Sequence, residues 1–215
     1  MLSGTLLLAS LVSLGMFAAG ALFGESDFLW FMIWNLFLAW LPLVFMLWLL
    51  RTLRRKRWSS WQGISLSLLW LGFLPNSFYM VTDYMHLRSV PSDEVVYNSV
   101  MLTSFILNGL LLGYVSLYLF HRELRKRLPG STARGMVATV LLLCSFAIYL
   151  GRELRWNTWD VLLNPAGLLF DISNRFISPM SYPQMFVTTA AFFVLLTTVY
   201  YVIWNLIRAL RQSEQ

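Results

Sequence analysis

Six long apolar runs, separated by short polar stretches, dominate the pattern of this chain. An α-helix needs about 20 apolar residues to cross a hydrocarbon core roughly 30 Å thick, and all the runs but one reach that length. The exception has 16 residues. The pattern therefore predicts an all-α fold, a six-span transmembrane helical bundle that forms one integral membrane domain over residues 1–215. The predicted spans are residues 2–23, 28–50, 61–81, 98–120, 135–150 and 182–207.

The composition supports this class of protein. Hydrophobic residues make up 58% of the chain and charged residues 12%, whereas soluble domains contain about 25% charged residues. A secretory signal would require Lys or Arg before the first run, and none is present. We therefore expect that run to be a true membrane span. Gly109 and Gly113, four residues apart in the fourth run, would let two helices approach closely.

Basic residues favour one side of the predicted bundle. With six spans, twelve of the sixteen Lys and Arg residues fall on one side and eight of the ten acidic residues fall on the other. Cytoplasmic loops are enriched in Lys and Arg, so this bias predicts that both termini are cytoplasmic. We expect membrane lipids, and no nucleic acid, as partners of these basic loops. The twelve residues are Arg51, Arg54, Arg55, Lys56, Arg57, Arg122, Arg125, Lys126, Arg127, Arg134, Arg208 and Arg211.

Pro75 interrupts the third run. It follows Trp61 by 14 residues, which places it about 21 Å along a helix that rises 1.5 Å per residue. Proline removes one helical hydrogen bond and crowds the preceding turn, so we expect a kinked third helix in the outer half of the membrane. Asn76 and Ser77 come directly after the proline and are candidates to bond the carbonyl groups that it frees.

A first polar stretch, residues 74–88, surrounds this proline. If the helix resumes there, Tyr79, Asp83 and His86 lie at positions i, i+4 and i+7 on one face. Such a face suits proton transfer or a metal ion, but the second histidine of a His-Glu-x-x-His site is missing, which makes Asp83 and His86 weak metal candidates. The alternative is structural: Asp83 caps a helix or pairs with an arginine, while His86 lies at the interface.

A second polar stretch, residues 151–160, follows the short fifth run. Arg152 and Arg155 fall on the expected exoplasmic side, against the general charge bias. An ion pair would explain these arginines, and so would an anionic ligand held by a guanidinium fork. The acidic residues expected in reach are Asp83, Glu153 and Asp160.

Aromatic and apolar residues place this region at the membrane interface. Trp156 and Trp159 offer flat apolar surfaces that suit an interfacial helix or a lipid or sugar headgroup. Residues 161–170 are apolar again but too few to cross the membrane, and Asn164 and Pro165 interrupt them. We therefore expect an interfacial or re-entrant segment before the last helix.

The two polar stretches together resemble the motifs of a bacterial family of polytopic membrane proteins known only as a domain of unknown function. The segments that carry the resemblance are Leu-Pro-Asn-x-x-Tyr-x-x-Thr-Asp from Leu74 and Gly-Arg-x-Leu-Arg-Trp-Asn-x-Trp-Asp from Gly151. That family has an apolar residue where Glu153 stands, so Glu153 departs from its pattern. The resemblance implies a six-span protein of the bacterial plasma (inner) membrane and supplies no reaction, substrate or cofactor.

Three functions are open at this point. The first is binding or transport of an anionic small molecule or lipid headgroup in an exoplasmic pocket built from both stretches. The second is a membrane-embedded enzyme acting on a lipid-linked or envelope substrate, with Asp83 and His86 as base or metal ligands and an arginine as clamp. The third is a structural subunit with a buried polar lock. The candidate binding residues are Asn76, Tyr79, Thr82, Asp83, His86, Arg152, Arg155, Trp156, Asn157, Trp159 and Asp160.

No predicted span carries a charge near its centre. This pattern disfavours a proton- or ion-driven pump, because such relays need ionisable groups at depth. We expect no cofactor, while the question of enzymatic activity and the oligomeric state stay open.

Overall fold

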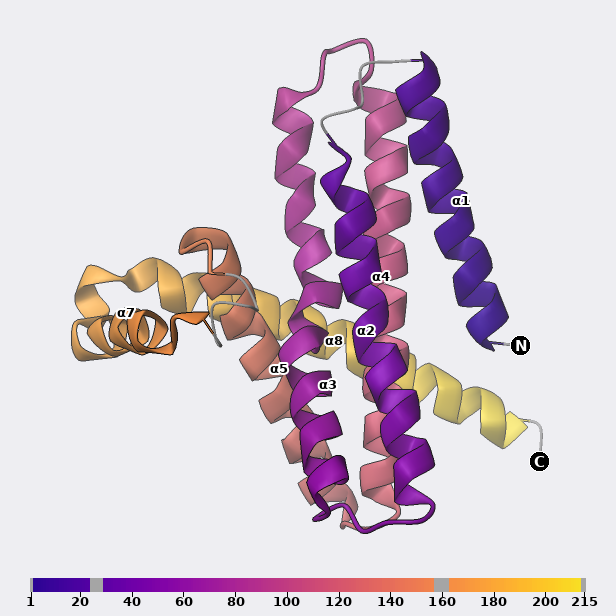
Figure 1. Ribbon diagram of the computed structural model, residues 1–215, viewed down its shortest axis with the longest axis vertical. Helices are drawn as coiled ribbons and strands as arrows, with labels where there is room; N and C mark the ends of the chain where they lie inside the picture. The colour runs from indigo at the N-terminus through magenta and orange to yellow at the C-terminus, as the bar shows by residue number, and fades with distance from the viewer. Residues whose placement is uncertain (1, 24–28, 157–162, 214–215) are drawn as a thin grey trace. The chain divides into compact units, whose positions relative to one another are not determined.

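The computed structural model describes residues 2–23, 29–156 and 163–213, and these residues contain helices and no strand (Figure 1). Six helices are long and apolar enough to cross a membrane, which confirms the predicted six-span all-α fold. The elements are α1 (Leu2–Phe23), α2 (Phe31–Leu53), α3 (Trp61–Tyr79), the 3-10 helix η2 (Met80–Ser89), α4 (Val95–Arg125), α5 (Gly130–Glu153), α7 (Pro165–Ile177), the 3-10 helix η3 (Pro179–Ser181) and α8 (Pro183–Ser213).

The chain groups into two compact units, Met1–Phe120 and His121–Gln215. The first unit contains α1, α2, α3, η2 and most of α4. The second contains the last residues of α4 together with α5, α7, η3 and α8. Each unit is defined by its own internal contacts. The expectation that the whole chain forms one membrane domain therefore stays a prediction.

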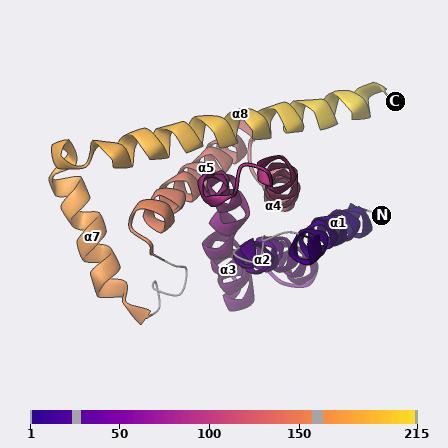
Figure 2. The same cartoon turned by 90° about the horizontal axis from the view of Figure 1, so that it is seen from above.

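In the first unit, α1, α2, α3 and α4 run alongside one another (Figures 1 and 2). Apolar side chains of α1, α2 and α4 form a common core. Polar side chains add specific links: the Trp40 indole donates to the Ser10 hydroxyl at 3.0 Å, and the Trp70 indole donates to Ser116 at 2.6 Å. Because lipid tails are as apolar as the helix surfaces, close packing and such hydrogen bonds hold membrane helices together.

Gly109 and Gly113 bring α4 close to α3, as their spacing indicates. A Cβ atom at Gly109 would lie 2.8 Å from the backbone oxygen of Ser77, and a Cβ atom at Gly113 would lie 2.8 Å from the Phe78 ring. Both distances are shorter than a van der Waals contact, so a larger residue would push the helices apart. The two glycines therefore serve the packing of α4 on α3.

The third membrane helix changes type shortly after Pro75. α3 stays α-helical through the proline as far as Tyr79, and η2 then continues the chain as a 3-10 helix. The side-chain amide of Asn76 donates to the Phe73 carbonyl at 3.1 Å, in the turn that contains Pro75. The helix type thus changes after Tyr79, four residues beyond Pro75, while the kink expected at the proline itself stays a prediction.

In the second unit, α5 lies beside α8 (Figure 2). Tyr200 of α8 is buried, and its hydroxyl bonds with Nδ1 of His121, near the C-terminal end of α4, at 2.8 Å. α5 has 24 residues, a length of about 36 Å, which is enough to cross a membrane. It is longer than the apolar run that predicted it because polar residues such as Ser131 and Arg134 form its first turns.

α7 is a short helix between α5 and α8. Oδ1 of Asn164 accepts the backbone N–H of Gly167 at 3.1 Å and caps the helix, while Pro165 lies in the first turn. The Asn-Pro pair thus starts a helix where the sequence pattern suggested an interruption. With 13 residues, about 20 Å, α7 is too short to cross a membrane. Figure 2 shows α7 joining the N-terminal end of α8.

Candidate functional site

The candidate binding residues fall in both units. Five of them lie on α3 and η2 of the first unit, and three lie at the end of α5 in the second. The prediction that the two polar stretches form one site stays a prediction. The five are Asn76, Tyr79, Thr82, Asp83 and His86, and the three are Arg152, Arg155 and Trp156. The remaining candidates, Asn157, Trp159 and Asp160, lie outside the described residues.

Asp83 is the most deeply buried acidic residue among those described in the first unit, with 1% of its surface exposed. The side-chain amide of Asn35 on α2 donates to its Oδ2 atom at 3.0 Å. Nε2 of His86, one 3-10 turn further along, lies 4.0 Å from Oδ1, and the imidazole ring packs against Phe31 with 4.6 Å between centroids. A buried carboxylate needs such partners, because an unpartnered polar group in an apolar environment is costly.

The 3-10 geometry of η2 decides which side chains share the Asp83 face. A 3-10 helix has three residues per turn, so residues three apart lie one above the other. Asp83 and His86 therefore share a face. The α-helical register that would place Tyr79 on that face as well does not apply, because the helix changes type directly after Tyr79.

The neighbouring polar residues serve the local backbone. The Thr82 hydroxyl donates to the Tyr79 carbonyl at 2.7 Å, across the switch from α to 3-10 geometry. The Ser77 hydroxyl crosses to α2, where it donates to the Ala39 carbonyl at 3.1 Å. Together with the bond between Asn35 and Asp83, this contact joins the third membrane helix to α2 by buried polar groups. No group of three or more His, Cys, Asp or Glu side chains that could hold a metal ion occurs in the described part of the chain.

The second polar stretch begins where α5 ends. Arg155 adopts a left-handed backbone conformation with φ of 58°, the one non-glycine residue described with a positive φ. The following amide, that of Trp156, returns to the Leu150 carbonyl at 3.2 Å and closes the end of the helix. A left-handed residue just beyond a helix is a common termination, but glycine usually occupies that place because it has no Cβ atom. An arginine here costs about 1–2 kcal/mol of backbone energy.

A network of polar and aromatic side chains joins this turn to α7. The Trp156 indole donates to Oδ2 of Asp171 at 2.9 Å. Arg175, one turn further along α7, donates from Nη1 to the Asp171 carbonyl at 2.7 Å and from Nε to the Tyr149 hydroxyl of α5 at 3.2 Å. Its guanidinium also lies 4.9 Å from the centroid of the Tyr182 ring. We call these five residues the α5–α7 cluster.

The sequence analysis did not identify four members of the α5–α7 cluster. Tyr149, Asp171, Arg175 and Tyr182 were not among the candidates, whereas Trp156 was. One signal was available: Asp171 and Arg175 are four residues apart, the spacing at which opposite charges meet on a helix, and Nη1 of Arg175 lies 3.7 Å from Oδ1 of Asp171. That signal required a helix over residues 171–175, which follow the apolar segment of residues 161–170 that was expected to be interfacial or re-entrant.

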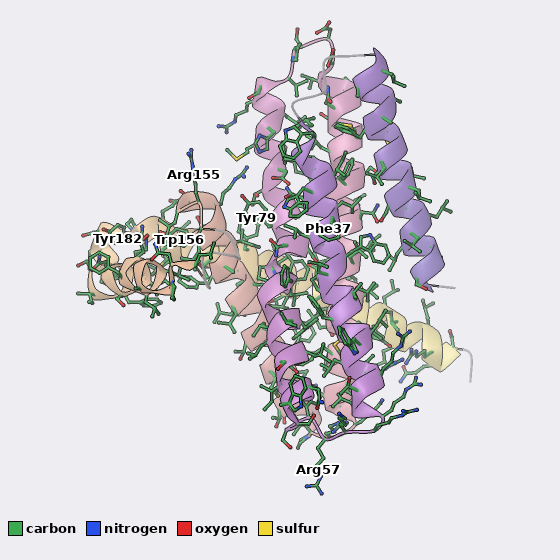
Figure 3. All side chains as sticks on the ribbon, viewed as in Figure 1. Phe37, Arg57, Tyr79, Arg155, Trp156 and Tyr182 are labelled. Carbon is green, nitrogen blue, oxygen red and sulfur yellow. The ribbon has the colours of Figure 1, made fainter. Side chains whose placement is uncertain are left out.

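Arg152 and Arg155, the two arginines of the second polar stretch, have different surroundings. Arg152 is half-buried and has interactions of its own, while Arg155 is exposed. Within the described residues, no ion pair involves Arg155. Figure 3 shows its side chain projecting away from Trp156 and Tyr182. The turn therefore presents a cation outward, on a backbone that the Trp156 contacts hold in place.

Six helices that are long and apolar enough to cross a membrane define a multi-pass helical membrane protein. Residues 34–199 match the model of the family described as Protein of unknown function (DUF1361), and the chain belongs to that family. The match includes both polar stretches. No curated protein and no solved structure matches the chain. The resemblance stated from the sequence is thus confirmed at the level of a family of unknown function.

Proposed function

We propose that this protein binds an anionic group, either a small molecule or a lipid headgroup, through Arg155 at the end of α5, with Arg152 beside it in the sequence. The observation that carries the proposal is the setting of Arg155. Its side chain is exposed, its backbone is in the left-handed region, and no carboxylate among the described residues pairs with it.

The backbone of Arg155 supports this proposal. Left-handed non-glycine residues are energetically unfavourable and occur preferentially at ligand-binding and active sites. Here the conformation is held on its C-terminal side, because Trp156 bonds both to the Leu150 carbonyl and to Asp171. A guanidinium presents donors in a planar fork that matches carboxylate and phosphate oxygens. Holding the backbone in one conformation reduces the entropy that a bound anion would otherwise have to remove.

The charge distribution gives a second line of support. The four basic residues outside the strongly basic side of the chain are Arg88, Arg152, Arg155 and Arg175. Arg175 belongs to the α5–α7 cluster and is therefore occupied. In the proposed orientation, with both termini in the cytoplasm of a bacterial cell, the end of α5 faces the exoplasmic side, where arginine is less common than in cytoplasmic loops. A ligand would give Arg155 a role there.

Asp83 and His86 favour a structural role over catalysis. A general base must reach the proton that it removes, and Asp83 is 1% exposed with one oxygen already bonded to Asn35. The distance of 4.0 Å between Asp83 and His86 is also longer than a hydrogen bond. We infer that the Asn35–Asp83 contact is a buried polar lock between α2 and η2, and that ligand binding belongs to the end of α5.

Replacing Arg155 tests the proposed function. Arg155→Gly removes the guanidinium and suits the left-handed backbone, so the protein should fold with equal or greater thermal stability. Arg155→Lys keeps a charge but loses the planar fork. Arg57→Gly, in the exposed loop between α2 and α3, is the matched control (Figure 3).

Two probes distinguish the sources of the anion. Phosphatidylglycerol is compared with phosphatidylcholine by native mass spectrometry of the purified protein, and inorganic phosphate is titrated by calorimetry. We expect Arg155→Gly to lose about tenfold or more in affinity for whichever anion binds, which corresponds to one charge-assisted hydrogen bond. Arg155→Lys should fall between the wild type and Arg155→Gly, and Arg57→Gly should bind normally. Equal anion binding by Arg155→Gly and the wild type would overturn the proposal.

A further inference from the structure

The charged and apolar side chains of α7 lie on opposite faces. Successive residues of an α-helix are rotated by about 100°, which places Asp171 and Arg175 together on one side. That side faces α5, because Asp171 bonds to Trp156 and Arg175 bonds to Tyr149. These are the two charged residues of α7, so both of its charges lie on the side toward α5, where the Arg175 side chain is 12% exposed and the Asp171 side chain 37% exposed.

The opposite face of α7 is apolar and largely exposed among the described residues, although at its edge the Phe176 ring lies 6.0 Å from the Phe146 ring of α5. The same rotation groups its large apolar residues within about one third of a turn, with Ser173 near the middle. No residue of α7 is buried. The exposed apolar residues of this outer face, with their exposed fractions, are Leu169 (63%), Phe170 (67%), Phe176 (59%) and Ile177 (77%).

This arrangement is the reverse of a helix on the surface of a water-soluble protein, which turns its apolar face inward and its charges toward water. Covering a large apolar side chain is worth about 1.5–3 kcal/mol relative to leaving it in water. Four such residues on one face therefore indicate that something apolar covers the outer face of α7.

The position of α7 in the chain identifies what covers it. η3 leads directly from α7 into α8, and α5 ends 12 residues before α7 begins. Both α5 and α8 are candidate membrane spans, so α7 is tethered on either side to helices that lie in a bilayer. The helix is about 20 Å long and cannot cross the hydrocarbon core itself. Lipid of the same membrane is therefore the neighbour within reach of its apolar face.

We propose that α7 lies along the membrane interface and that its outer face docks onto the acyl chains of the adjacent leaflet. The bilayer then holds the outer side of α7 while the α5–α7 cluster holds its inner side. Many interfacial helices attach through basic residues that attract anionic headgroups. The outer face of α7 carries no charged residue, so its attachment depends on apolar burial and is independent of lipid charge. This inference stands whether or not Arg155 binds an anion.

Spin labels on the outer face test the inference in nanodiscs. The background is Cys144→Ala, which removes the only native thiol. Ser173→Cys is nearly isosteric and lies at the centre of the face, and Ile177→Cys lies at its C-terminal end. Arg57→Cys, in the exposed loop after α2, reports water access. Collision rates are measured with oxygen, which concentrates in lipid, and with a water-soluble nickel chelate.

We expect labels at Ser173 and Ile177 to collide with oxygen several-fold more often, relative to the nickel chelate, than the label at Arg57. The ratio should be the same in phosphatidylcholine and phosphatidylglycerol nanodiscs. Nickel access at Ser173 equal to that at Arg57 would overturn the inference. So would a label depth that requires phosphatidylglycerol, because attachment would then be electrostatic. Dipolar broadening between labels at Ser173 would also overturn it, since a second copy of the chain would cover the face.

Discussion

The hydrogen bond between Asn35 and Asp83 should stabilise the first unit by an amount that a double-mutant cycle can measure. Asn35→Ala removes a donor at 3.0 Å from a carboxylate with 1% exposure. A buried acceptor that loses its partner costs about 1–3 kcal/mol, because no water replaces the lost donor. Hydrogen bonds between membrane helices average about 0.6 kcal/mol in such cycles. We expect the bond to Asp83 to exceed that average, because its acceptor is almost completely buried.

The cycle compares the wild type, Asn35→Ala, Asp83→Ala and the double variant. The free energy of unfolding is measured by titrating sodium dodecyl sulfate into the detergent-solubilised protein. In the wild-type background, Asn35→Ala should lower it by about 1–3 kcal/mol. In the Asp83→Ala background the same change should cost close to nothing, because the carboxylate is already absent.

The matched control is Asn205→Ala on α8, where the asparagine is exposed. This change should leave the free energy of unfolding within about 0.5 kcal/mol of the wild-type value. The reasoning is refuted if Asn35→Ala has the same effect in both backgrounds to within about 0.5 kcal/mol, the limit for independent sites. The lock between α2 and η2 would then have to rest on other contacts.

Two further changes test the packing of the first unit. Gly109→Ala should lower the thermal midpoint by the equivalent of about 1–3 kcal/mol, because its new methyl group meets the Ser77 carbonyl. Gly72→Ala has open space around its methyl group and should raise the midpoint by the equivalent of up to about 1 kcal/mol. Equal midpoints for the two variants would contradict this account. Ser13→Ala should lower the free energy of unfolding in detergent by roughly 0.6–1.7 kcal/mol, because it removes the acceptor for Asn108 at 3.0 Å and the contact with the Ser104 hydroxyl at 2.6 Å. An unchanged value would show that the Ser13 hydroxyl does not hold α1 to α4.

The membrane spans were predictable from the sequence, and their ends were less so. An apolar run of about 20 residues has few alternatives to a membrane helix, and each predicted run corresponds to a candidate span in the structure. The end of a helix depends on capping and local hydrogen bonds rather than on hydropathy. α5 therefore begins at Gly130, before the apolar residues that revealed it. For the same reason, the Asn164-Pro165 pair was interpreted as an interruption although it caps a helix.

The partners of the polar residues were not predictable from hydropathy. Asn35 and Asp83 are 48 residues apart, and their contact depends on how α2 and η2 are rotated about their axes. A hydropathy profile contains no information on that rotation. The 3-10 form of η2 adds a second difficulty, because it shifts every residue after Tyr79 relative to an α-helical register. The family match does not supply these contacts either, since the function of the family is unknown.

One physical rule accounts for the polar side chains that bond between helices in both units. The hydrophobic effect does not draw helices together within lipid, so polar contacts and close packing specify how membrane helices pair. Ser13, Asn108 and Asp83 point inward for this reason in the first unit, and Asp171 and Arg175 bond to Trp156 and Tyr149 in the second.

Arg155 does not follow this inward orientation, and a packing role does not explain it. It belongs to a polar stretch at the end of a membrane helix, yet it is exposed and carries an unfavourable backbone conformation. A residue that served only to end the helix would be better as glycine, which adopts this conformation without strain. The guanidinium is what Arg155 adds over glycine, and an anion is the natural partner for it. Greater stability of Arg155→Gly together with loss of anion binding would show that the backbone strain accompanies function.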